Sequence, residues 1–141
     1  MKALALLVVL AGCVEASSGV GDPPSTCSED SQCGTGVCAS TGECMSADET
    51  QTARVTWTIN GQAPDDYLCY WTTSFKAVFQ ASPEIGPDQE TWDSPQLACT
   101  AGTFTIEKLP RRFWIGGATS QSNGMWVPLD ETGVAAVNLT P

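Results

Sequence analysis

The stretch "RVTWTI", residues 54–59, decides the fold class of this chain. Its apolar side chains, Val55, Trp57 and Ile59, alternate with polar ones. A period of two residues is typical of a β-strand with one buried face. Asn60-Gly61 follows directly, and this pair favours a tight turn. The stretch therefore predicts a half-buried strand that ends in a turn.

The same alternation recurs toward the C-terminus. It is found in "SFKAVFQA" (74–81), "TFTIEKL" (103–109) and "RRFWIGGA" (111–118), with Phe75, Ala77, Phe79, Phe104, Ile106, Phe113 and Ile115 as the inward members. "SNGM" (122–125) predicts a hairpin turn between this region and the last strands, "MWVPL" (125–129) and "VAAVNL" (134–139). No segment has a helical apolar stripe. Residues 52–141 are therefore predicted to form an all-β sandwich of six or seven strands.

The composition limits the possible partners. The chain has 141 residues, 16 acidic and 6 basic side chains, and a net charge of −10. Such a negative surface excludes nucleic acid as a partner. The chain has no histidine to serve as a proton shuttle or a metal ligand.

The first twelve residues have the parts of a secretion signal. Lys2 is basic, residues 3–10 are apolar but too few to span a bilayer, and Ala11-Gly12 precede Cys13. "LAGC" (10–13) resembles the lipobox of bacterial lipoproteins, which implies removal of residues 1–12 and a diacylglycerol, with palmitate-type chains, on Cys13. Val14 stands where the inner-membrane retention signal of that family has Asp. The resemblance thus implies the outer membrane of a Gram-negative bacterium.

Residues 13–26 are small and polar and include Pro23 and Pro24, so we expect an acylated N-terminus and a flexible tether. The next segment, residues 27–45, contains Cys27, Cys33, Cys38 and Cys44. Their spacing lacks the close C-x2-C pairs of a zinc site or a redox site. Two disulfides are therefore expected, in an oxidising compartment.

Four cysteines permit three pairings, and the sequence alone does not choose among them. We favour Cys27 with Cys38 and Cys33 with Cys44, because these interleaved bridges tie the whole segment together. The pattern C-x-x-D-x-x-C-x-x-G-x-C resembles small EGF-like or Dickkopf-like modules of bacterial surface lipoproteins. Residues 46–51 are then expected to be a linker.

Cys69 and Cys99, the remaining pair, are expected to form a third disulfide. "WTINGQAPDDYLC" (57–69) and "ACTAGTFTIEKLPRRFWI" (98–115) resemble a domain of bacterial lipoproteins that is related to the prealbumin-like, or carboxypeptidase-regulatory-like, sandwich. The resemblance implies an Ig-like arrangement of strands. Arg111 and Arg112 depart from it, since the family has Gly-x-Tyr after Leu-Pro, and they are candidates for a contact surface.

The sequence favours no enzymatic activity. Without histidine, Ser-His and Cys-His catalysis are excluded. A pair of carboxylates could in principle act on glycosides. The carboxylates of the two Pro-containing loops suit solvated turns better; they are Asp65, Asp66, Glu84, Asp88, Glu90 and Asp93. No cofactor and no metal site are predicted.

Tryptophans suggest a different kind of site. Trp71, Trp92 and Trp126 do not all fit the inward alternation, so they are candidate ligand contacts as well as candidate cover for the edge of the sandwich. We therefore expect a lipid-anchored protein of the cell envelope with a non-catalytic structural or protein-interaction role. The alternatives are a carbohydrate-binding module and, third, an inhibitor of an extracellular enzyme. The partner would be the membrane, through Cys13, together with an envelope protein or polysaccharide.

Overall fold

The computed structural model describes residues 26–70, 72, 74–83, 89–121 and 123–140, and most of its elements are strands. The helical elements in this part of the chain are short 3-10 turns, η1 (Asp30–Cys33), η2 (Ala47–Glu49) and η3 (Cys99–Ala101). The prediction of the all-β class is thus confirmed.

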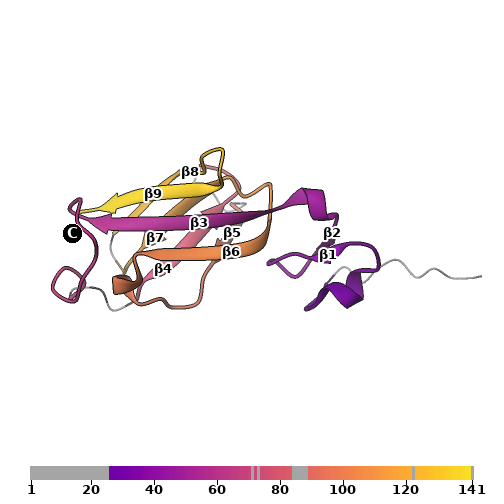
Figure 1. Ribbon diagram of the computed structural model, residues 1–141, viewed down its shortest axis with the longest axis horizontal. Coiled ribbons are helices and arrows are strands. Elements are labelled where there is room, and N and C mark those ends of the chain that lie inside the picture. The colour runs from indigo at the N-terminus through magenta and orange to yellow at the C-terminus, as the bar shows by residue number, and fades with distance from the viewer. Residues whose placement is uncertain (1–25, 71, 73, 84–88, 122, 141) are drawn as a thin grey trace, which may run out of the picture.

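A small N-terminal unit, the disulfide module (residues 27–45), lies at one end of the molecule (Figure 1). Its strands β1 (Val37–Cys38) and β2 (Cys44–Met45) pair antiparallel. Cys27 is bonded to Cys38 and Cys33 to Cys44, which is the interleaved pairing favoured from the sequence. Across β1 and β2, Cys38 is the direct partner of Cys44, so the two bridges lie side by side.

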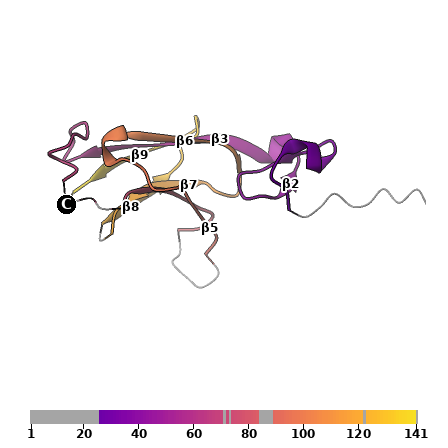
Figure 2. The same ribbon diagram turned by 90° about the horizontal axis from the view of Figure 1, so that it is seen from below.

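The remaining strands, in the sheet domain (residues 50–140), form two sheets. In the three-stranded sheet, β3 (Thr50–Ile59) runs between β6 (Thr103–Pro110), which is antiparallel to it, and β9 (Val134–Leu139), which is parallel. The four-stranded sheet has the antiparallel order β5 (Thr91–Asp93), β4 (Lys76–Gln80), β7 (Ile115–Thr119), β8 (Gly124–Pro128). Figure 2 shows the sheets as two layers.

One apolar core is shared by both sheets. Val55, Trp57 and Ile59 of β3 are buried, as the alternation in "RVTWTI" predicts. They belong to the same buried cluster as Phe79 of β4 and Val137 of β9. Full burial of each such side chain contributes about 1.5–3 kcal/mol, so this cluster is the main stabilising feature of the sheet domain.

Several boundaries differ from the expectation. The strand Thr91–Asp93 was not expected, because three residues are too few to show a period. Residues 111–114 form a turn before β7 rather than the start of a strand. Residues 46–51, expected as a linker, form η2 and the first two residues of β3. The expected third disulfide is confirmed, since Cys69 is bonded to Cys99.

Candidate functional site

The outer face of the four-stranded sheet carries a groove. Strand β7 sets its position: Gly116 faces inward, because a side chain there would meet Ala135 of β9, and Ile115 and Gly117 therefore face outward. The prediction that Ile115 faces inward is thus wrong, although its side chain is buried on the outer face. The groove has a volume of about 490 Å³, which lies within the range of ~300–1,000 Å³ that is common for small-molecule sites. Residues that line it include Gln80, Gln89, Trp114, Ile115, Trp126 and Pro128.

The indole of Trp126 lies against the sheet over two glycines. Trp126 is the register partner of Gly117 across β7 and β8, and a Cβ at Gly117 would overlap its ring. A Cβ at Gly124 would overlap the other end of the same ring. The missing side chains let the indole lie flat, and Trp126 is still 42% exposed. One aromatic face is thus held ready for contact.

Trp114 provides a second aromatic wall just before β7. Its indole nitrogen donates a hydrogen bond to the carbonyl oxygen of Ala81 at 2.8 Å, which ties the ring to the end of β4. Its backbone is held as well, since its N–H donates to Gln80 and its carbonyl accepts from Leu129. With 43% of its surface exposed, Trp114 is both anchored and accessible.

The polar groups of the groove are neutral. The lining residues that the structure describes carry no charge, and Gln80 and Gln89 supply amide groups that can donate and accept hydrogen bonds. Gln89 is oriented by its own amide, which donates to the carbonyl oxygen of Ser82 at 3.1 Å. Two ring faces and neutral amides form a surface for a ligand that is itself flat, uncharged and polar at its edges.

No protein-family model, curated protein or solved structure matches this chain.

Of the tryptophans singled out in the sequence, Trp126 alone is found in the groove among the residues that the structure describes. Trp92 points inward from β5, with its ring 6.0 Å from both Phe79 and Phe104. Its indole nitrogen donates to the carbonyl oxygen of Ser40 at 3.1 Å, so Trp92 connects the core to the disulfide module. Trp71 lies outside the described residues, as does Cys13.

The two arginines lie at the junction between the disulfide module and the sheet domain. Arg112 makes a two-pronged contact with Glu90, at 2.6 Å for its closest pair of atoms, and also binds Glu43 of the module. The hydrogen bond from Arg112 holds the pKa of Glu43 below its usual range. Arg111 donates to the backbone carbonyl of Asp48 at 2.7 Å. Both guanidinium groups are thus used within the chain.

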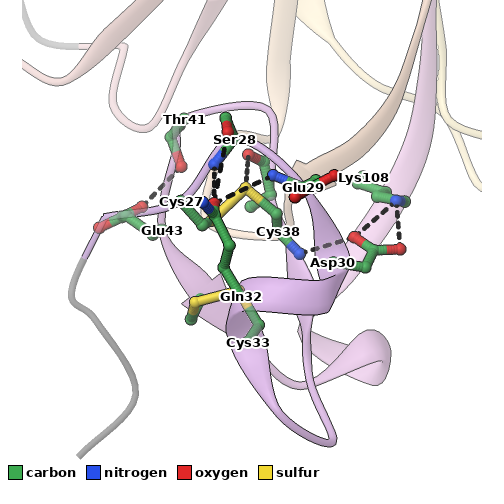
Figure 3. Close-up of a disulfide and its surroundings, with 12 residues drawn as sticks. Cys27, Ser28, Glu29, Asp30, Gln32, Cys33, Cys38, Thr41, Glu43 and Lys108 are labelled. Atoms are coloured by element: carbon green, nitrogen blue, oxygen red, sulfur yellow. Dashed lines mark hydrogen bonds and ion pairs between the residues drawn. A yellow bond between two sulfur atoms is a disulfide. The ribbon is translucent and has the colours of Figure 1, made fainter.

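A second ion pair crosses the same junction. Strand β6 has a bulge opposite Thr52, and Lys108 there takes a left-handed backbone conformation, with φ 54°. The bulge directs the ammonium of Lys108 to Asp30, at 2.7 Å (Figure 3). The carbonyl oxygen of Lys108 accepts a hydrogen bond from the N–H of Ser40, at 3.0 Å. The hydrogen bond from Lys108, with one from the Cys38 N–H, lowers the pKa of Asp30.

The carboxylates considered for catalysis are dispersed. Glu90 binds Arg112, Asp93 pairs with Lys76 at 3.4 Å, and Asp65 accepts the N–H of Leu68 at 2.7 Å. Glu84 and Asp88 lie outside the described residues. Glu90 and Asp93 therefore serve in ion pairs, and Asp65 serves in a turn.

The sulfur atoms of Cys27, Cys33 and Cys38 lie within 4.8 Å of one another. Since all three are in disulfides, they lack the thiolate form that a metal requires. Within the described ranges, no helix combines the length and the apolar character that a membrane crossing requires.

Proposed function

We propose that this chain is a lipid-anchored, non-catalytic protein of the cell envelope that displays its sheet domain for interaction. The observation that carries the proposal is the use of the cysteines. Six of the seven are bonded in pairs, which leaves Cys13, the residue at the end of "LAGC", as the odd one. Three disulfides fit an oxidising compartment, and a lipobox assigns the remaining sulfur to lipid.

The finer fold assignment is also a proposal. We assign the two sheets to an Ig-like or prealbumin-like sandwich, preceded by an EGF-like or Dickkopf-like disulfide module. In support, the two sheets share one core, and Cys69 is bonded to Cys99. The expected divisions stay as proposed: signal peptide 1–12, tether 13–26 and module 27–45.

The junction supports a role in display. Arg112 and Lys108 hold the disulfide module against the end of β6, and Trp92 joins the module to the core. The module is then a spacer with a fixed orientation, which continues the sheet domain toward the tether.

Two acyl chains anchor a protein durably, because each buried methylene contributes about 0.8 kcal/mol. The test is expression in a Gram-negative host, followed by membrane fractionation and mass measurement of the N-terminal peptide. The wild-type chain should begin at an acylated Cys13 and sediment with outer membranes. Cys13→Ser should be released in soluble form.

The lipid proposal fails if Cys13→Ser still sediments with membranes or if the wild-type peptide carries no lipid. A non-reducing mass of the Cys13→Ser form should show the six remaining thiols oxidised. Among the alternatives, the groove favours the carbohydrate-binding one, and no observation favours enzyme inhibition.

A further inference from the structure

The ring faces of the groove restrict the kind of ligand it can hold. Trp126 lies flat over Gly117 and Gly124, so its exposed face is oriented without any ligand. Trp114 is held by its bond to Ala81. Because both rings are fixed in advance, a ligand loses little binding energy to ordering the site. A flat ligand surface of C–H groups would stack on such rings.

The absence of charged side chains from the described lining of the groove restricts the kind of ligand further. Within the described part of the chain, the lining has only the amides of Gln80 and Gln89 as flexible polar groups, and the whole chain has a net charge of −10. An anionic ligand would be repelled, and a buried charge of either sign would have no partner. Hydroxyl groups, which both donate and accept, match the amides.

A proline-rich peptide is the other uncharged ligand that prefers aromatic grooves. An aromatic groove holds such a peptide with polar donors as well as with ring faces. In this groove, the indole nitrogen of Trp114 already donates to Ala81, so this donor is used within the chain. At Trp114, a ligand that needs the ring face rather than the N–H is therefore favoured.

From these observations we infer that the groove binds an uncharged polysaccharide, with sugar rings stacked on Trp114 and Trp126 and hydroxyl groups bonded to Gln80 and Gln89. The inference rests on the proposed display function and specifies its ligand. The described lining of the groove holds no carboxylate, so the site is proposed to bind the polysaccharide and not to hydrolyse it.

The test uses the full chain, solubilised in detergent, and its Cys13→Ser form. Both are titrated with tetrasaccharides of glucose, mannose, galactose and N-acetylglucosamine, and with a proline-rich peptide, while the fluorescence of tryptophan is followed. At least one neutral tetrasaccharide should bind and shift the emission. Removal of either ring, by Trp114→Ala or Trp126→Ala, should weaken that binding about tenfold, the loss of one stacking contact.

Gly124→Ala is the sharpest variant, because it removes no ligand contact. The new methyl group would occupy the place of the Trp126 ring, and the backbone at Gly124 does not need a positive φ. The indole must tilt, and binding should fall without a loss of stability. Trp92→Phe is the matched control: it changes a tryptophan outside the groove and should leave the affinity for the tetrasaccharide unchanged.

The inference is overturned if no neutral tetrasaccharide binds, if only the peptide binds, or if Trp114→Ala and Trp126→Ala variants that keep their circular dichroism bind as the wild type does. None of these results would move the chain from the membrane fraction. Failure of the saccharide site and failure of the lipid anchor are thus separate outcomes.

Discussion

The disulfide module and the sheet domain reach a defined structure by opposite means. In the module, residues 27–45, the buried apolar side chains are Cys33 and Ala39, and two disulfides supply the constraint. The sheet domain has a continuous core around Phe79 and Trp57, and a single disulfide. A short segment without large apolar residues needs cross-links, whereas a longer one can rely on burial.

The contact between these regions is of a third kind. It consists of ion pairs and hydrogen bonds that are partly exposed, such as Lys108 with Asp30, whose side chains are 42% and 46% exposed. Exposed pairs contribute little each, so the junction depends on several of them acting together with the bond from Trp92 to Ser40. Core, disulfides and junction should therefore respond to different perturbations.

The largest effect is expected from the core. Phe79 has no exposed surface, and Phe79→Ala should lower the free energy of unfolding by about 3–5 kcal/mol through lost burial and a cavity. Urea denaturation followed by tryptophan fluorescence measures this change. Tyr67→Ala, at a site 79% exposed, is the control and should stay within ~0.5 kcal/mol of the wild type. Equal effects of the two would contradict the view that burial stabilises the sheet domain.

The next effect separates the two regions. The double variant Cys33→Ser/Cys44→Ser removes a bridge across a sequence separation of 11 residues. A loop of this size contributes about 3 kcal/mol, and the loss should be confined to the module. Hydrogen exchange should accelerate at amides of residues 27–45 while those of β3 and β9 stay protected.

Cys69→Ser/Cys99→Ser is the matched control for that variant. It opens the bridge between Cys69 and η3, and should leave exchange in the module unchanged. If loss of the module bridge lowered the melting temperature of the sheets as much as Phe79→Ala does, the two regions would be one cooperative unit, and the comparison would fail.

The contrast between the regions also explains what the sequence could predict. The burial of Val55, Trp57 and Ile59 follows from a local period, and the structure confirms it. The pairing of Cys33 with Cys44 was favoured because interleaved bridges tie the whole segment together, and it too is present. Both predictions depend on residues close together in the chain.

The groove could not be predicted in this way. It requires the register of β7 against β8, which places Gly117 beneath Trp126, and the approach of Trp114 to Ala81. These contacts are set by tertiary pairing. The local alternation was misleading here: it placed Ile115 on the inward face, but residues 111–114 form a turn and Ile115 lies on the outer face beside the groove.

The same limit applies to Trp92 and Arg112. Trp92 was a candidate ligand contact because the tryptophans singled out do not all fit the inward alternation, yet it packs inward on the side of β5 that faces Phe104. Arg112 was a candidate because it breaks a family pattern, and it binds Glu43, which is 69 positions away in the sequence. Partner choice over such distances is not encoded in local composition.

A smaller effect is expected at the junction. Trp92→Phe keeps the ring between Phe79 and Phe104 but removes the N–H that donates to Ser40. The expected loss is about 0.5–1.5 kcal/mol, the net value of one hydrogen bond. Amide exchange around Ser40 should accelerate, while the urea midpoint of the sheets changes little. A large fall in that midpoint would mean that Trp92 stabilises the core itself.

The smallest effect is a dependence on acid. The pKa of Asp30 is lowered by Lys108 and the pKa of Glu43 by Arg112, so each carboxylate binds a proton less readily in the folded chain. The stability that these two carboxylates contribute is complete above their pKa values in the unfolded chain, which are about 4. It is lost as the pH falls through their lowered pKa values in the folded chain. The junction should therefore open more often below about pH 4. Hydrogen exchange at the Ser40 amide, corrected for its intrinsic pH dependence, should then become faster.

Asp30→Asn should reproduce part of that opening at neutral pH, because the amide cannot form the ion pair with Lys108. Asp93→Asn removes the pair with Lys76, which lies outside the junction, and should leave Ser40 unaffected. Added salt should act in the same direction as acid, since exposed pairs are screened. A junction that is weaker than both regions should open before either of them. If acid instead accelerated hydrogen exchange in β3 and in the module together, the ion pairs would not define a separate junction.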